Sequence, residues 1–120
     1  MTESSAAASC LFCRIARGEL RSTKVAESEH ALAFRDVNPV APSHVLLIPK
    51  EHVAESAAAL GPAHGALLGE LFALAARVAA DEGLERGWRL VVNVGPDAGQ
   101  TVPHLHMHML GGRALDWPPG

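Results

Sequence analysis

The amino-acid sequence has no long hydrophobic run and no cluster of basic residues, and each absence excludes a class of protein. Hydrophobic residues make up 48% of the 120 residues, yet no run of them is long enough to span a bilayer. A net charge of −3 without a Lys/Arg stripe argues against nucleic acid as the main partner. We therefore expect a soluble globular protein that binds neither membranes nor nucleic acid.

Cysteine is also scarce, since the chain contains only Cys10 and Cys13. Two cysteines so close together in the sequence cannot form a disulfide that stabilises a whole domain. A reducing, cytoplasmic location is therefore the simpler expectation. The opening MTESSAAASC carries an acidic residue and no apolar stretch of signal-peptide length. We predict a disordered leader over residues 1–9 and a single domain over residues 10–120, because this length suffices for one core.

The order of hydrophobic patterns predicts an α+β domain. A short N-terminal helix is expected over SCLFCRIARGEL, a hairpin over residues 25–27 and 31–36, and a buried strand at HVLLIP. One long helix is expected between residues 62 and 83, where apolar residues recur at helical spacing: Leu67, Leu71, Leu74 and Val78. WRLVVNV and the histidine-rich segment follow as antiparallel neighbours. These elements predict a five-stranded antiparallel sheet with one long and one short helix.

The most informative stretch is TVPHLHMHML at residues 101–110, where His104, His106 and His108 occupy every second position. A proline near its start and two glycines after it leave room for a strand but not for a stable helix. Alternate residues of a strand share a face. The three imidazoles should therefore line one face, while the residues between them pack into the core: Leu105, Met107 and Met109.

Three imidazoles on one strand can bind a metal, transfer protons or supply a nucleophile. Rings two residues apart on a pleated strand diverge too far for one compact tetrahedral metal site. Nucleophilic catalysis fits better, because a neutral imidazole can attack phosphorus or carbon while its neighbours fix the tautomer and protonate the leaving group. In the preceding loop, Gly95 and Gly99 allow N–H groups to face an anion, and Gln100 and Thr101 add an amide and a hydroxyl.

The segment GQTVPHLHMHMLGGR resembles the signature of the histidine triad (HIT) family, in which histidines alternate with apolar residues just after a Gly-Gln-hydroxyl turn. FRDVNPVAPSHVLLIPKEH resembles that family's nucleoside-binding strand and loop, VVNVGPDAGQ its phosphate loop, and WPPG the C-terminus of its nucleotide-binding Hint branch. The resemblance runs from about residue 10 to residue 120. It implies an α+β sheet with a long helix, usually as a homodimer.

The resemblance also implies roles for individual residues. His106 matches the nucleophile that takes the nucleotidyl group, and His108 matches the residue that contacts phosphate and helps the leaving group. Thr101 stands where the family usually has serine and keeps the hydroxyl, whereas Pro103 replaces a bulkier residue. The expected catalytic set is His106, His108, Thr101 and His104.

Further matches give the expected nucleotide contacts. Asp36 matches the carboxylate that binds the ribose hydroxyls, although from the residues alone it would be interpreted as a turn residue before Asn38-Pro39. The resemblance places apolar walls around the base, a further histidine in the site, and donors beside the phosphate. The full expected set is Asp36, Val37, Phe12, Phe34, His44, Asn93, Gly99, Gln100, Thr101, His106 and His108.

The pair Cys10 and Cys13 forms a C-x2-C motif, one half of a common zinc pattern. The other half could be His52 and His104. Some members of the HIT family, which this sequence resembles, carry this Cys, Cys, His, His set and bind structural zinc, whereas others lack the cysteines. The alternative is two reduced thiols on one face of a short helix. We expect structural zinc, in which case His104 would be a structural ligand rather than a catalytic group.

Three functions remain compatible with these features. The expected one is a purine nucleoside phosphoramidase of Hint type, a hydrolase that cleaves a phosphorus–nitrogen bond in a nucleoside 5′-monophosphate derivative through a covalent nucleotidyl-histidine. The alternatives are a dinucleoside polyphosphate hydrolase and a nucleotide-binding scaffold protein with incidental catalysis. The WPPG ending without a long extension favours the first. By the resemblance, residues from Trp117 onward should lie near His106 of the other subunit in a homodimer.

Overall fold

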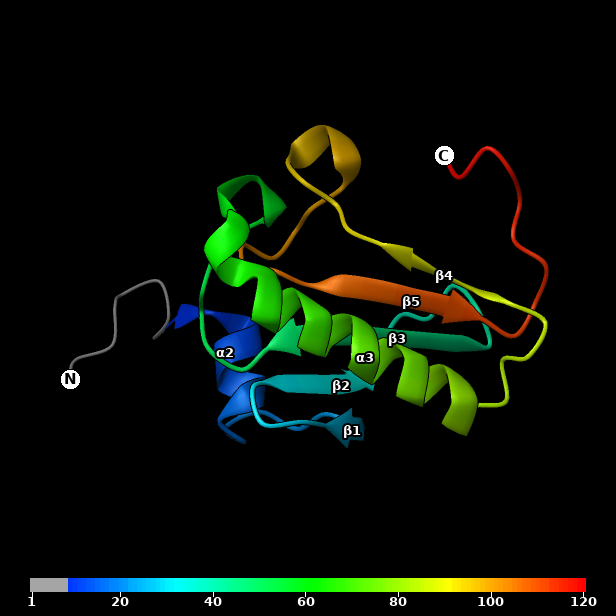
Figure 1. Ribbon diagram of the computed structural model, residues 1–120, viewed down its shortest axis with the longest axis horizontal. Coiled ribbons are helices and arrows are strands. Elements are labelled where there is room, and N and C mark those ends of the chain that lie inside the picture. The colour runs from blue at the N-terminus through cyan, green and yellow to red at the C-terminus, as the bar shows by residue number, and fades with distance from the viewer. Residues whose placement is uncertain (1–8) are drawn as a thin grey trace.

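The computed structural model describes residues 9–120, which form one five-stranded antiparallel sheet (Figure 1). The predicted leader therefore lies, apart from Ser9, outside the described residues. The strands are β1 Lys24–Glu27, β2 Ala31–Arg35, β3 Ser43–Pro49, β4 Trp88–Val91 and β5 Met107–Gly111. They lie in the order β1-β2-β3-β5-β4, and every neighbouring pair is antiparallel. The predicted α+β fold class is confirmed.

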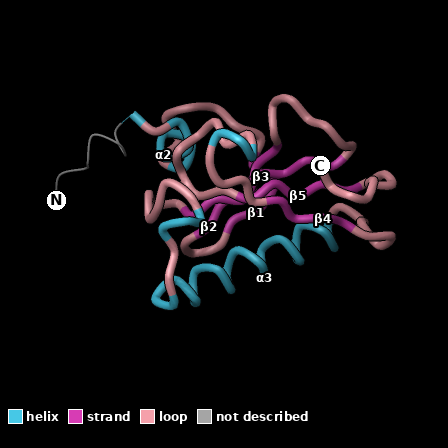
Figure 2. The backbone as a smooth tube through the Cα atoms, turned by 90° about the horizontal axis from the view of Figure 1, so that it is seen from above, coloured by secondary structure: helices cyan, strands magenta, loops and turns pink. Residues whose placement is uncertain are grey.

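Two helices lie on opposite faces of this sheet: the long α3, Gly65–Asp81, and the short α2, Leu11–Ala16 (Figure 2). Short 3-10 turns occupy Ala57–Ala59, Pro62–His64 and Pro96–Ala98. The segment Pro62–Asp81 is long and apolar enough to cross a membrane, a test that core helices also pass. Here Leu71, Leu74 and Val78 are buried in the core between α3 and the sheet. The expected cytoplasmic location stays a prediction.

Alternation along the strands divides the core into two apolar layers. The layer between the sheet and α3 includes Val45, Leu47 and the three residues that separate the histidines: Leu105, Met107 and Met109. The layer beneath α2 includes Phe12 and Phe34. The predicted burial of the residues between the histidines is thus confirmed, and it turns the histidines toward the α2 side.

The histidine segment departs from the expected strand at its beginning. β5 starts at Met107, where it pairs with Leu47, so His104 and His106 precede the ladder. The chain there turns to another partner, because the N–H of Leu105 donates to the carbonyl of Ala54 at 2.9 Å. Proline supplies no ladder donor, and Pro49 ends the neighbouring strand β3 at this level.

Candidate functional site

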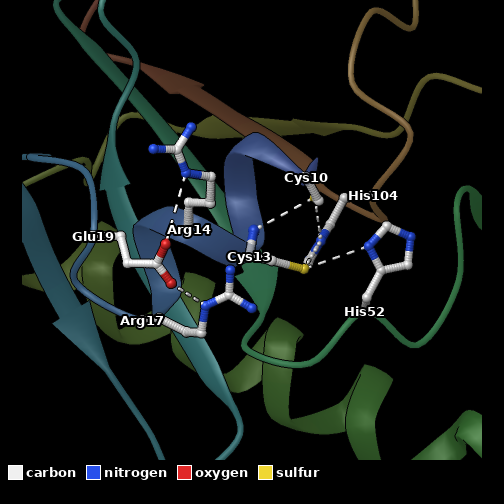
Figure 3. A network of polar contacts seen from close by, with 7 residues as sticks. All are labelled: Cys10, Cys13, Arg14, Arg17, Glu19, His52 and His104. Atoms are coloured by element: carbon white, nitrogen blue, oxygen red, sulfur yellow. Dashed lines mark hydrogen bonds and ion pairs between the residues drawn. The ribbon is translucent and has the colours of Figure 1, made fainter. Parts of the chain in front are cut away.

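His104 forms a cluster with Cys10, Cys13 and the half-buried His52 (Figure 3). Its Nδ1 lies 3.2 Å from Sγ of Cys10 and 3.5 Å from Sγ of Cys13. Nδ1 of His52 lies 3.4 Å from the same Sγ of Cys13. In a tetrahedral zinc site, ligand atoms of these types lie about 3.5 Å apart. The predicted Cys, Cys, His, His set is therefore confirmed as a cluster with zinc-site dimensions.

The short helix explains how two cysteines reach one point. Cys10 is the N-cap of α2, and its Sγ accepts from the backbone N–H of Cys13 at 3.4 Å. Residues three apart in a helix share a side, so both thiols point to the same histidines. Both cysteines are buried and free of disulfides.

The tautomer of His104 also suits a metal ligand. Its Nε2 lies 2.9 Å from the carbonyl oxygen of Pro49, which can only accept, so Nε2 carries the hydrogen. Nδ1 then keeps a lone pair directed at the cysteine sulfurs. Burial, opposed by the bond to Pro49, lowers the pKa of His104 to about 4, which keeps the ring neutral near pH 7. A second partner that fixes the ring is the usual support of a metal-bound histidine.

His106 has the opposite tautomer, which leaves its outer nitrogen free to react. Its Nδ1 lies 2.7 Å from the carbonyl oxygen of His104, so Nδ1 donates and Nε2 keeps the lone pair. Phe12 packs edge-on against the ring at a centroid distance of 5.1 Å, and His108 does so at 5.2 Å. A buried and oriented imidazole with a lone pair on its outer nitrogen can act as a nucleophile.

His108 is held by a chain of hydrogen bonds that begins at a backbone amide. The N–H of Val40 donates to Nδ1 of His44 at 3.1 Å, which leaves the hydrogen of the neutral His44 ring on Nε2. That Nε2 lies 2.9 Å from Nδ1 of His108. His108 therefore accepts at Nδ1 and carries its own hydrogen on Nε2. Sequence reasoning missed Val40, because a backbone donor leaves no mark on residue type.

Asp36 lies beside this pair of histidines. Its Oδ2 is 3.4 Å from Nε2 of His44 and 3.9 Å from Nδ1 of His108, while its Oδ1 accepts from the N–H of Asn38 at 2.8 Å. Burial is the main influence on both rings and lowers the pKa of His44 and of His108, whereas the charge of Asp36 acts in the opposite direction. Both imidazoles are therefore neutral near pH 7.

Asp36, His44 and His108 also offer three ligand atoms within 4.8 Å of one another. Two histidines and a carboxylate are a frequent metal-binding set. Coordination through Nε2 of His44 would place the hydrogen on Nδ1, where the N–H of Val40 already donates. The tautomer thus opposes a metal ion here, and the trio is better described as a hydrogen-bonded chain.

A cavity of about 450 Å³ opens next to His108, between α2 and the end of β2. The predicted base walls Phe12 and Phe34 line it and pack edge-on at 5.7 Å. The predicted nucleotide contacts Asp36, Val37 and Thr101 line the same cavity. The structure thus gathers most of the expected nucleotide site around one opening. Further lining residues that sequence reasoning did not single out are Leu11, Ile15, Leu20, Arg21, Ser22, Leu46 and Val102.

The loop before the histidines uses its backbone N–H groups in internal hydrogen bonds. Gly95 and Gly99 have φ values of 83° and 85°, the left-handed conformation that glycine adopts without strain. The N–H of Gly95 donates to Oε1 of Gln100 at 3.0 Å, and the N–H of Gly99 donates to the carbonyl of Pro96 at 3.0 Å. The loop uses these two N–H groups internally, so the expected contact of either with an anion would require that hydrogen bond to be exchanged.

Gln100 links this loop by hydrogen bonds to the chain that follows His52. Its Nε2 donates to the carbonyls of Glu55 at 2.7 Å and Val102 at 3.1 Å, which engages both amide hydrogens. A phosphate contact by Gln100 or Gly99 would require the loop to rearrange, and it stays a prediction. Asn93 lies two residues after the end of β4, and its phosphate contact also stays a prediction.

Comparison with known proteins gives a consistent result. The model of the HIT domain family matches residues 17–115. The chain belongs to the HIT family. An uncharacterized HIT-like protein of Synechococcus elongatus is 51% identical over 110 residues, which cover 92% of this chain and 96% of that protein. The crystal structure of a HIT family hydrolase from Legionella pneumophila has a TM-score of 0.89 at 48% identity and covers 92% of this chain and 99% of the other.

The name of another relative bears on the metal cluster. A protein of Zea mays named 14 kDa zinc-binding protein is 49% identical over 113 residues, covering 92% of this chain and 87% of that protein. The predicted family membership is confirmed. Within this HIT fold, His104 belongs to the metal cluster and His108 lines the cavity, while His106 contacts two cavity-lining residues, Phe12 and His108.

Proposed function

We propose that this HIT protein is a purine nucleoside phosphoramidase, a hydrolase that cleaves the phosphorus–nitrogen bond of nucleoside 5′-monophosphate derivatives. The observation that carries the proposal is the bond from Nδ1 of His106 to the carbonyl of His104, which leaves the lone pair of Nε2 for nucleophilic attack. His108 and Phe12, which contact this ring, line the cavity next to it. The hydrolase names of the solved relatives from Legionella pneumophila and Clostridium thermocellum support the reaction class.

The proposed reaction has two displacements at phosphorus. In the first, Nε2 of His106 attacks, the bond to the leaving nitrogen breaks, and the amine departs with the electron pair and takes up a proton. The Nε2–H of His108, oriented by His44, can hydrogen-bond to the leaving group in this step, and the proton that the amine takes up comes from solvent. In the second, water attacks the nucleotidyl-histidine, loses a proton and releases His106. The net reaction consumes one water and yields an amine and a nucleoside monophosphate.

The nucleotide would bind along the cavity. Asp36 can accept hydrogen bonds from two neighbouring ribose hydroxyls, because a carboxylate has two acceptor oxygens. Phe12 and Phe34 offer apolar surface to a purine, and the hydroxyl of Thr101 lies on the same cavity wall. Two of the three expected parts of a nucleotide site, the ribose carboxylate and the base walls, are thus supported by their common position.

We infer that this chain binds one structural zinc ion at Cys10, Cys13, His52 and His104. The donor types, the separations near 3.5 Å and the tautomer of His104 support this assignment. The metal would join α2 to the segment after β3 and to the histidine segment. No step of the proposed reaction passes through it, so the ring of His104 has a structural role and its carbonyl orients His106.

We also propose that the protein is a homodimer. β4 forms one edge of the sheet, and large apolar side chains on and after it are exposed: Trp88, Val92 and Val94. On α3, Phe72 is 53% exposed and belongs to a face rich in Ala and Gly. Exposed sheet edges and apolar patches are normally covered by protein. A second copy of the chain would cover both.

Trapping the covalent intermediate tests the proposed function. Adenosine 5′-phosphoramidate is incubated with the protein, quenched in base and analysed by peptide mass spectrometry; the adduct is expected on His106. His106→Asn should lower kcat by about a thousandfold or more while nucleotide binding persists. His64→Asn, at a half-buried histidine of the 3-10 turn Pro62–His64 that does not line the cavity, is the matched control. An adduct on another residue contradicts the assignment.

Substrate comparison separates the alternatives. Faster turnover of diadenosine polyphosphate than of adenosine phosphoramidate would favour a dinucleoside polyphosphate hydrolase. Binding of nucleotides without turnover of either compound would favour a scaffold protein. Binding without turnover is not expected, because the tautomers of His106 and His108 suit catalysis.

A further inference from the structure

The nucleotide cavity has a polar end that the proposed function leaves unexplained. The chain just after α2 contributes Leu20, Arg21 and Ser22 to the cavity wall. Arg21 is exposed, and among residues 9–120 its guanidinium forms no hydrogen bond or ion pair. On the wall of a cavity lined by aromatic and aliphatic side chains, such a guanidinium is a binding group without a partner in the described part of the chain.

Neighbouring arginines differ from Arg21 in this respect. Arg14 and Arg17 both pair with Glu19, on the outer side of α2 (Figure 3). Arg35 also lines the cavity, but its guanidinium donates to both carboxylate oxygens of Glu82, one of them at 2.9 Å. Among the described residues that line this cavity, Arg21 is therefore the arginine whose donors remain available.

The position of Arg21 matches the base of a bound nucleotide. This step rests on the proposed function, which places phosphorus beside His106 and His108 and the ribose on Asp36. The base must then occupy the rest of the cavity, where Phe12 and Phe34 are joined in the wall by Leu11, Ile15, Leu20, Arg21 and Ser22. The aliphatic residues can cover the faces of a purine, so an edge of the ring is left for Arg21.

The chemistry of the guanidinium then selects between the two purines. Arginine offers a planar fork of N–H donors and no acceptor. Guanine presents two adjacent acceptors, O6 and N7, whereas adenine presents N7 next to an amino donor. We propose that Arg21 is a specificity residue that donates to O6 and N7 of guanine, which makes guanosine 5′-monophosphate derivatives the preferred substrates.

Equilibrium binding tests this proposal without any bond cleavage. Calorimetric titrations of the full-length protein use GMP, inosine 5′-monophosphate, AMP and the 5′-monophosphate of 2-aminopurine riboside. Inosine keeps O6 and N7 but lacks the 2-amino group, while 2-aminopurine keeps the amino group and lacks O6. GMP and the inosine nucleotide should each bind at least about fivefold more tightly than the other two.

Variants assign this preference to one side chain. Arg21→Met should reduce the affinity ratio of GMP to AMP to near one, and Arg21→Lys should leave a smaller ratio than the native protein, because an ammonium lacks the planar fork. Arg14→Met, on the same part of the chain but outside the cavity wall, should keep the native ratio. Thermal melting of each variant checks that the fold is retained, as expected for an exposed residue.

Several results would overturn the proposal. They are a native ratio near one, a ratio unchanged in Arg21→Met, inosine nucleotide binding no better than AMP, or no binding of any of the four nucleotides. The proposed hydrolysis can be refuted separately from the proposed role of Arg21. A guanine preference that depends on Arg21, in a protein that turns over no phosphoramidate, would leave the base assignment standing and remove the proposed reaction.

Discussion

The carbonyl oxygen of His104 accepts a 2.7 Å hydrogen bond from Nδ1 of His106. One residue thus contributes to two sites, since its ring belongs to the cysteine-containing cluster and its backbone fixes the tautomer of the proposed nucleophile. The ring of His104 is in turn held by the carbonyl of Pro49. A mutation that disrupts the metal cluster should therefore alter the orientation of His106, because His104 belongs to both sites. Effects on the metal site and on the proposed nucleotide site should be measured in the same variants.

Metal content is the first prediction. Protein purified without added zinc should contain about one zinc per chain, because the four donors form one tetrahedral set. Cys13→Ser should lower both the zinc content and the melting temperature, since serine is a poor zinc ligand. Elemental analysis and thermal melting measure the two effects. His64→Ala, which leaves the cluster intact, should keep the native zinc content, and native protein with far less than one zinc per chain would refute the site.

The pH dependence of Asp36→Asn is the second prediction. Protonation of His44 and His108 removes the neutral forms, so kcat should fall as the pH drops through their pKa values, which burial places below the usual 6.5. The charge of Asp36 raises both values. Removing that charge lowers the pKa of both rings, so the acid limb of the kcat profile should move to lower pH, while KM rises as the ribose contact is lost.

Steady-state rates between about pH 5 and pH 8, the range in which histidine titrates, measure this shift. Asp97→Asn, in the 3-10 turn of the loop, is the matched control and should leave the profile unchanged. An acid limb that stays in place or moves to higher pH in Asp36→Asn would show that the carboxylate does not act on these histidines.

The C-terminal tail gives the third prediction. Trp117 is 80% exposed and precedes two prolines, so the tail cannot join a central strand and its aromatic ring needs a surface to cover it. We expect a homodimer in which the tail lies near His106 of the other copy. Deleting residues 117–120 should change selectivity among leaving groups more than it changes the melting temperature. Light scattering that shows a monomer, or a deletion with an unaltered substrate profile, would count against this arrangement.

The apolar layer beneath α3 supplies the fourth prediction. Leu71 is 0% exposed and packs between α3 and the sheet. Leu71→Ala should lower the free energy of unfolding by about 2–5 kcal/mol, since it removes buried methyl groups and leaves a cavity. Val37→Ala, at a residue that is 88% exposed, should change it by less than about 0.5 kcal/mol. Denaturant unfolding with zinc present measures both, and equal effects would contradict this packing.

Local patterns in the sequence were enough to predict the elements and their faces. Alternation over a few residues placed Met107 and Met109 in the core and the histidines on the other side, and helical spacing placed Leu71, Leu74 and Val78 against the sheet. Such patterns report which side of an element is apolar, because burial of that side dominates the folding free energy. The beginning of β5 was wrong by several residues, because the chain there pairs with Ala54 rather than with the sheet.

The tertiary structure alone decided what each histidine can do. Cys10 and His104 lie 94 residues apart, and His44 and His108 lie 64 apart, yet each pair is within hydrogen-bond distance. The tautomers depend on the backbone N–H of Val40 and the backbone carbonyl of Pro49. Such backbone groups occur in almost every residue type, so the sequence does not mark them. Residue types therefore indicate that imidazoles are present, whereas the location of each proton depends on which backbone groups the fold brings beside them.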